Sequence, residues 1–417
     1  MNQMTAGLVT GQGSNSVLVR HFNERVILAI LRRMGQASKA EIARQSSLTN
    51  NAAGVIVREL EQAGLIREDG KKHSGSRGQP ATMLTLVPEG AFGVGVKLDR
   101  MSIETVIVDF TGSVIGCRRH TMALPSPDKA IDILVADIDD LVSAIPEGWR
   151  SRLTGIGVAA PNTFVGCLEG SDIATAHLEA WEQFDIAAAL RSRIEIDVFD
   201  ENDGNAAAVA ELFYGHGRKL NDFIYVFVGP VICGGVVIDS ECVRGVTGNA
   251  GCFAMIPVAP SRLDSAQASN NSTGKLLQRA STTSLIRHMR FHGAAIATPA
   301  DVGAAIRGMP DIFSAWLDDC VEALTLPLLS AAAILDMPTI VLDGELDRHL
   351  LQEMIGRLQD QLIARSPKQR RTPRLMLGSF GPDAGAIGAA SLPMHVNFSP
   401  LAKILTGNHA MGRELPQ

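Results

Sequence analysis

The sequence predicts an α/β protein in two parts, a small basic segment of helices and a hairpin followed by a larger domain of alternating strands and helices. The charge divides in this way, because residues 1–87 hold 11 Lys and Arg against 6 Asp and Glu, whereas residues 88–417 hold 27 against 38. The hydrophobic spacing changes as well, from helical in the first part to alternating strands and helices after Gly93. Pro88 follows an alternating run and marks the expected boundary between domains 1–87 and 88–417.

Composition narrows the class of protein. A length of 417 residues suggests two or three domains, and 46% hydrophobic with 20% charged residues is typical of a globular chain. No apolar run reaches the ~18 residues of a membrane span, and residues 1–16 do not resemble a secretory signal. The six cysteines form no C-x-x-C pair, which favours free thiols in a reducing cytoplasm over a disulfide framework.

The basic segment predicts three helices. Apolar residues at helical spacing indicate the first helix over 22–34. Ser38 and Glu41 form a capping-box pattern that opens a short second helix ending near Gln45. After a tight turn, Thr49 caps a third helix that runs to Ala63 and is closed by Gly64.

The third helix has two contrasting faces. Its inward stripe is expected to contain Ala53, Ile56, Leu60 and Ala63, and its outer face Asn51, Gly54, Val55 and Arg58. A helix in the DNA major groove needs such a small, polar and uncharged-to-basic face, which approaches base edges closely and offers amide and guanidinium groups.

Two strands, over 65–68 and 81–87, flank a basic loop over 69–80. Helix, turn, helix and basic wing in this order predict a winged helix-turn-helix that binds DNA. Asn51, Gly54, Val55 and Arg58 would contact bases, with Thr49 and Asn50 of the first turn near phosphates. Lys71, Lys72 and Arg77 of the wing would mainly contact phosphates.

The larger segment predicts two α/β halves. Strands are expected over 92–99, 103–110, 114–122 and 153–159, with a helix over 128–143. The scheme restarts with a strand at Glu195, followed by helices over 202–214, 317–335 and 351–363 and strands over 222–228, 235–239, 339–342 and 374–377. Two such halves suggest two lobes with a ligand cleft between them.

Three blocks carry a resemblance to a known family, namely 155–161 (GIGVAAP), 201–207 (ENDGNAA) and 245–251 (GVTGNAG). With them, residues 15–392 resemble the ROK family of repressors, open reading frames and kinases. The resemblance implies the two-lobed actin/hexokinase-like, ribonuclease H-like fold. Family members with a winged helix resemble transcriptional repressors that respond to sugars.

The resemblance also allows kinase chemistry to be tested. Asp203 matches the general base of ROK sugar kinases, and Asn202 matches a sugar-binding amide. The first phosphate loop, D-x-G-G-T in the family, is 99–102 (DRMS) here, and the second, G-T-G-I-G-x-G, is 229–235 (GPVICGG). Glycines that admit phosphates are lost, Pro230 removes an N–H donor, and Asp343 is expected near the polyphosphate. The sequence therefore predicts no ATP use and no enzyme activity.

The segments of this sequence that correspond to the sugar and zinc motifs of the family also depart from those motifs. Residues 248–255 (GNAGCFAM) lack the family's Glu and His, and residues 260–273 contain no cysteine. No metal or other cofactor is expected, since a zinc ligand set is missing. His177 and Asn249 are candidates for effector binding beside Asn202 and Asp203, although both are equally compatible with ordinary loop positions.

The expected protein is thus a cytoplasmic regulator that binds operator DNA and a sugar-type effector, as a homodimer or dimer of dimers, and no membrane. Two alternatives stay open. One is an active sugar kinase with a DNA-binding domain, using Asp203 as base. The other is a ligand-independent DNA-binding protein whose large domain only oligomerises.

Overall fold

The computed structural model describes residues 16–72, 80–164, 179–266, 273–367, 371–401 and 404. The chain forms two compact units. The first comprises Met1–Ala91 together with Met394–Gln417, and the second comprises Phe92–Pro393. The first unit thus ends four residues beyond Val87, the end of the expected first domain, and includes the C-terminal segment.

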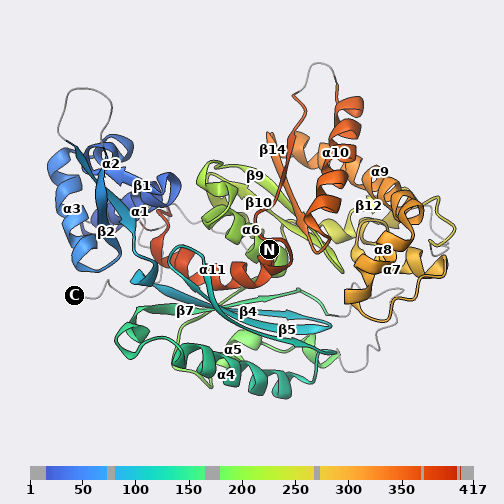
Figure 1. Cartoon of the computed structure of the whole chain (residues 1–417), viewed down its shortest axis with the longest axis horizontal. Coiled ribbons are helices and arrows are strands. Elements are labelled where there is room, and N and C mark those ends of the chain that lie inside the picture. The colour runs from blue at the N-terminus through green and yellow to red at the C-terminus, as the bar shows by residue number, and fades with distance from the viewer. Residues whose placement is uncertain are drawn as a thin grey trace, which may run out of the picture. The chain divides into compact units, whose positions relative to one another are not determined.

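The first unit contains three helices and a three-stranded sheet (Figure 1). The helices are α1 (Ser16–Met34), α2 (Lys39–Ser46) and α3 (Asn50–Gln62). The sheet has the order β1-β3-β2, from β1 (Gln36–Ser38), β2 (Ile66–Lys72) and β3 (Ala81–Leu86). The core is made of Ile27, Leu31, Ile42, Val57 and Leu60, all fully buried. The sequence did not indicate β1, and α1 begins earlier than expected.

The local signals of this unit are confirmed. The Glu41 N–H donates to Ser38 Oγ at 3.3 Å and the Ser38 N–H donates to Glu41 Oε2 at 2.8 Å, which completes the capping box. Thr49 Oγ1 accepts from the Ala52 N–H at 3.2 Å at the start of α3. Gly64 follows α3 with φ 69°, the left-handed conformation that favours glycine.

The first lobe of the second unit is built on a sheet of order β6-β5-β4-β7-β8. Its strands are β4 (Phe92–Asp99), β5 (Ser102–Asp109), β6 (Val114–Thr121), β7 (Leu153–Ala160) and β8 (Val198–Asn202). Helices α4 (Pro127–Ser143) and α5 (Ile186–Arg191) cover one face, and their Leu134, Ile138 and Leu190 are buried against it. β4, β7 and β8 are parallel, so their carboxyl ends share one edge.

The second lobe is built on a sheet of order β11-β10-β9-β14-β15. Its strands are β9 (Phe223–Val228), β10 (Ile232–Ile238), β11 (Glu241–Cys242), β14 (Thr339–Gly344) and β15 (Arg374–Leu377). β9, β14 and β15 are parallel. Ile224, Val226 and Val228 of β9 belong to the cluster that includes α9 (Pro310–Leu335) and α10 (Arg348–Arg365), whereas Phe223, Tyr225 and Phe227 pack toward α6 (Asp203–Phe213).

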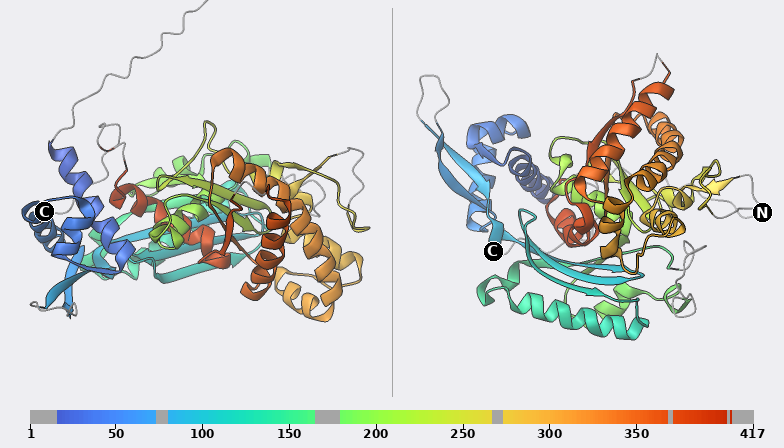
Figure 2. Two further views of the ribbon diagram at one scale, coloured as in Figure 1. Left: turned by 90° about the horizontal axis from the view of Figure 1, so that it is seen from above. Right: turned by 45° about the vertical axis from the view of Figure 1, so that its right-hand side comes forward.

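Two helices, α6 and α11 (Ala384–Phe398), lie between the two sheets (Figures 1 and 2). α11 approaches β7 so closely that a Cβ at Gly157 would overlap the carbonyl oxygen of Ala389. A Cβ at Gly388 would likewise overlap the carbonyl oxygen of Ala206 on α6. Small residues on both partners therefore allow backbone-to-backbone packing in the middle of the unit.

The remaining elements were not indicated by the sequence pattern. They are β12 (Pro257–Val258), β13 (Gly274–Lys275), α7 (Thr282–Phe291) and α8 (Val302–Gly308), with 3-10 turns at Pro88–Gly90, Glu147–Arg152, Glu179–Trp181, His216–Arg218, Phe253–Met255, Leu276–Gln278, Pro299–Asp301 and Gly381–Asp383. α11 was also missed. The strand expected to begin at Glu195 begins at Val198 instead, and α9 begins at Pro310 rather than Leu317.

Candidate functional site

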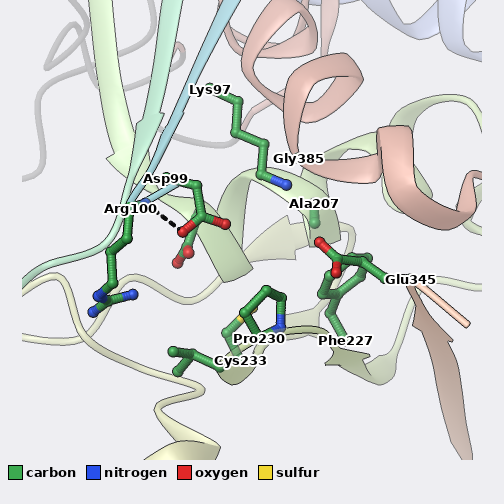
Figure 3. Close-up of a pocket in the computed structure, with 11 residues that line it drawn as sticks. Lys97, Asp99, Arg100, Ala207, Phe227, Pro230, Cys233, Glu345 and Gly385 are labelled. Carbon is green, nitrogen blue, oxygen red and sulfur yellow. Dashed lines mark hydrogen bonds between the residues drawn. The ribbon is translucent and has the colours of Figure 1, made fainter. Parts of the chain in front are cut away.

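A pocket in the second unit collects residues from the carboxyl ends of strands in both lobes (Figure 3). Asp99 ends β4, Asp203 follows β8, and Glu345 follows β14. Ligands in α/β proteins bind at such edges, because loops from several parallel strands meet there. The pocket encloses about 420 Å³ of space, open solvent at its mouth included, and is lined by Lys97, Asp99, Arg100, Asp203, Ala207, Phe227, Pro230, Val231, Cys233, Glu345 and Gly385.

The charges of the pocket are unequal, with three carboxylates around the ammonium group of Lys97. Burial lowers the pKa of Lys97, but the neighbouring carboxylates, Asp99 and Glu345 foremost, raise it by more, so Lys97 stays protonated. Burial and repulsion from Asp99 raise the pKa of Asp203, and burial raises the pKa of Glu345 against the opposing effect of Lys97. The raised pKa of Lys97 thus reflects the carboxylates around it, whereas burial is the main cause of the raised pKa values of Asp203 and Glu345.

The two segments that were compared with phosphate loops are the turns after β4 and after β9. Between β4 and β5, the Arg100 N–H donates to Asp99 Oδ1 at 2.6 Å, and the buried Arg100 guanidinium donates to the carbonyls of Phe164 and Thr163 at 2.8 and 2.9 Å. Between β9 and β10, Pro230 and Val231 place side chains at the pocket. The side chains that replace the family's glycines in the second loop therefore lie at the pocket wall.

The four predicted effector-binding residues lie at different places. Asp203 lines the pocket, whereas Asn202 caps α6, its Oδ1 accepting from the Gly204 N–H at 3.0 Å. Asn249 is exposed, and its Oδ1 accepts from Asn162 Nδ2 at 2.9 Å. His177 lies outside the described residues.

Asp343 does not face the pocket, which corrects the expectation that it would lie near a polyphosphate. It is fully buried and accepts from the backbone N–H groups of Phe380 and Gly381 at 3.2 and 3.0 Å, so it fixes the turn before α11. Glu345, two residues later, lines the pocket in its place. The sequence reasoning missed Glu345 and also Lys97, which is a charged residue within the apolar run Phe92–Leu98, a detectable signal.

Two polar contacts join the two lobes. Asn162, after β7, also donates to the Gly248 carbonyl at 3.3 Å. Arg244, after β11, forms an ion pair with Glu201 of β8, with Nε 2.8 Å from Oε2. Both pairs are at least partly exposed, so solvent screens them and each contributes little to stability.

The described residues around the lost zinc motif are held by other contacts. The buried Arg279 forms an ion pair with Asp319, with Nη2 2.7 Å from Oδ1, and donates to the Ala259 carbonyl at 3.0 Å. Among the residues that the structure describes, no group of three or more His, Cys, Asp and Glu could hold a metal ion.

The second candidate site is the outer face of α3. Thr49, Asn50, Asn51 and Arg58 are exposed, Val55 is 45% exposed, and Gly54 is half-buried. Arg58 Nε donates to the Gly54 carbonyl at 3.1 Å, one turn earlier on the same helix. This face is therefore free of contacts with the core formed by Ala53, Ile56, Val57 and Leu60.

The wing is a longer hairpin than the sequence indicated. β2 continues to Lys72, with Lys71 opposite Thr82 and an irregularity in register between Glu68 and Lys71, where Gly70 has φ 75°. Lys71 is exposed. Arg77 lies outside the described residues.

Comparison with known families shows which family this architecture belongs to. Residues 93–395 match the ROK family, and residues 23–67 match winged helix-turn-helix DNA-binding domains. The chain belongs to the ROK family. The ROK match covers both lobes and the pocket, and the winged-helix match covers α2 and α3.

Relatives of this ROK protein include uncharacterised protein y4fQ of Sinorhizobium fredii, 26% identical over 89% of this chain and 90% of that protein. The xylose repressor of Bacillus spizizenii is 24% identical over 57% of this chain and 61% of the repressor. This chain therefore aligns with less than two thirds of that repressor. The transcriptional repressor Mlc of Escherichia coli is 22% identical over 59% of each chain.

Solved structures share the fold. A ROK family transcriptional regulator, described as a homolog of Escherichia coli MLC, has a TM-score of 0.66 at 18% identity and covers 94% of this chain and 100% of its own. A ROK family glucokinase from Streptomyces griseus, in complex with glucose and AMPPNP, has a TM-score of 0.55 at 20% identity, covering 72% of this chain and 99% of its own. Regulators and kinases thus share this architecture, and the residues of the site must separate them.

Proposed function

We propose that this ROK protein is a sequence-specific DNA-binding transcriptional regulator, a repressor that responds to a sugar or a sugar-derived effector. The exposed outer face of α3 carries the proposal, because it leaves Asn51, Val55 and Arg58 available to base edges while the opposite face holds the domain together. Relatives with the names xylose repressor and N-acetylglucosamine repressor support the same proposal.

The effector would act through the two lobes. A ligand in the pocket that binds one arrangement of the lobes more tightly shifts their equilibrium toward it. The contacts of Asn162 with Asn249 and of Arg244 with Glu201 cross from one lobe to the other and are the ones to change. In a homodimer or dimer of dimers, this shift would alter the spacing of the DNA-binding domains on a palindromic operator.

The proposal includes the absence of kinase activity, although Asp203 is available as a base. Pro230 has no N–H to offer a phosphate, and Val231 and Cys233 take up space in the same turn. Glu345 adds a negative charge beside them. The pocket therefore does not offer a nucleoside triphosphate the backbone donors and the positive field that phosphoryl transfer uses.

The test begins with selection of an operator from random or genomic DNA by the full-length protein. Asn51→Ala and Arg58→Ala should each weaken operator binding by about 1–3 kcal/mol, and Lys71→Ala should reduce the slope of affinity against salt. Lys129→Ala, at an exposed lysine of α4, is the matched control and should bind as the wild type does. Unchanged operator affinity in both α3 variants would refute this interface.

The alternative functions have separate outcomes. Turnover of ATP with any common sugar, lost in Asp203→Asn, would establish a kinase. Operator binding that no sugar or polyol changes would favour a ligand-independent protein.

A further inference from the structure

We propose that the pocket takes an uncharged polyhydroxyl effector and excludes its phosphate esters, with Lys97 and Glu345 as the residues that set this selectivity. The inference rests on the proposed function and goes further, since it assigns a ligand class to the pocket. It follows from the positions of the cations, the carboxylates and the N–H donors around the cavity.

Lys97 is a resident cation of the pocket. Its side chain passes over Gly385, where a Cβ would lie 2.9 Å from Lys97 Cδ, so the glycine leaves room for it. Its Nζ lies 5.9 Å from the centre of the Phe227 ring. In Figure 3 the ammonium group points into the space between Asp99 and Glu345. An incoming cation is therefore not needed to balance these carboxylates and would be repelled by Lys97.

The second cation at the pocket is already engaged. Both carbonyl contacts of Arg100, to Thr163 and Phe164, hold its guanidinium in a buried position on the side of the first lobe. A phosphate would thus meet two cations, Lys97 and the fixed Arg100, against the three carboxylates of Asp99, Asp203 and Glu345. Since the site is half-buried, this surplus of negative charge is poorly screened.

Backbone N–H donors do not compensate for this negative charge. Helix N-termini bind phosphate through free N–H groups, but the Gly204 N–H at the start of α6 already donates to the side chains of Asn202 and Asp203, at 3.0 and 2.9 Å. Pro230 contributes no N–H to the neighbouring turn.

The same groups suit a neutral polyol. Ionised carboxylates only accept hydrogen bonds, and hydroxyl groups of a sugar donate them. Lys97 donates to ring or hydroxyl oxygens. The pocket therefore offers several acceptors and one strong donor to an uncharged ligand, whereas a phosphate ester brings further acceptors and negative charge.

The test compares each sugar with its own phosphate by calorimetry on the full-length protein. The probes are xylose alone, and glucose and N-acetylglucosamine each beside its 6-phosphate, with tripolyphosphate as a sugar-free anion. We expect a neutral sugar to bind at least about tenfold more tightly than its ester, and no binding of tripolyphosphate. Glu345→Gln should reduce that ratio about fivefold or more, mainly through tighter binding of the ester.

Two controls keep the outcome clear. Glu147→Gln makes the same change at an exposed glutamate and should leave the ratio unchanged. Asp99→Asn removes a second pocket charge while keeping an acceptor for the Arg100 N–H, and it replaces Glu345→Gln if that variant does not fold.

Equal or tighter binding of an ester by the wild type would overturn the inference, as would a ratio unchanged in both pocket variants. If no neutral sugar binds while operator binding is intact, the ligand class is wrong and the DNA-binding function stands. If operator binding is absent while the sugars bind selectively, the proposed function fails and the selectivity stands.

Discussion

Replacing Gly54 by alanine should stabilise the protein and weaken its binding to DNA. Gly54 lies inside α3, has no unusual φ, and a Cβ there would meet no atom within 4 Å. A glycine in a helix interior costs about 0.5–1 kcal/mol relative to alanine. The packing of α3 therefore gives no reason for a glycine at this position. The proposed close approach of α3 to DNA gives one, because a glycine leaves room for the DNA.

The expected magnitudes follow from this geometry. Gly54→Ala should raise the free energy of unfolding by about 0.5–1 kcal/mol, which in a winged-helix unit of this size corresponds to ~2–8 °C in Tm if that unit melts separately. The added methyl group, on the side of α3 that we propose faces DNA, should lower operator affinity by about 1 kcal/mol or more, which is about fivefold.

The assay pairs calorimetric or circular-dichroism melting with operator titration at fixed salt. The control is Gly356→Ala in α10, which is far from α3 in the sequence. A Cβ at Gly356 would also meet no atom within 4 Å. That variant should gain similar free energy and bind operator normally. If Gly54→Ala binds operator as tightly as the wild type, the reasoning about close approach is wrong.

Three further changes test the packing and the pocket. Ser38→Ala removes the N-cap of α2 and should cost about 1 kcal/mol of unfolding free energy, seen as a lower Tm, whereas an unchanged Tm would mean that the capping box contributes nothing. Gly157→Ala forces α11 away from β7 at the Ala389 backbone and should cost about 3 kcal/mol or more in denaturant melts, and a neutral effect would show that α11 can shift freely. Asp203→Asn tests the raised pKa of Asp203. The folded protein binds this proton more tightly than the unfolded chain, so the stability from this group falls as pH rises from the ordinary pKa of 3.8 through the raised pKa, and the variant should gain more stability at about pH 7 than at about pH 3. Equal gains at both pH values would contradict that shift.

None of the described helices combines the length and the apolar character that a membrane crossing requires. α11 is packed between the two sheets, because its small residues face β7 on one side and α6 on the other.

Much of the DNA-binding unit could be predicted from the sequence, because its signals are local. A capping box needs only Ser38 and Glu41 three residues apart, and helix termination at Gly64 needs only a residue that adopts positive φ. The exposed face of α3 follows from helical period and hydrophobicity alone. The strand β1 escaped prediction, since three residues carry almost no periodic signal, and only pairing with β3 defines it.

The sequence by itself determined the family blocks, the two-part charge distribution and the loss of the phosphate-loop glycines. Only the tertiary structure decided which charges share a pocket, because Lys97 lies on β4, whereas Asp203 and Glu345 follow β8 and β14, which are far apart in the chain. It also separated Asp343 from Glu345, since the first points into the turn before α11 and the second follows the strand end into the cavity. Side-chain direction at a strand end depends on how the chain turns, and that is set by long-range packing that no local pattern contains.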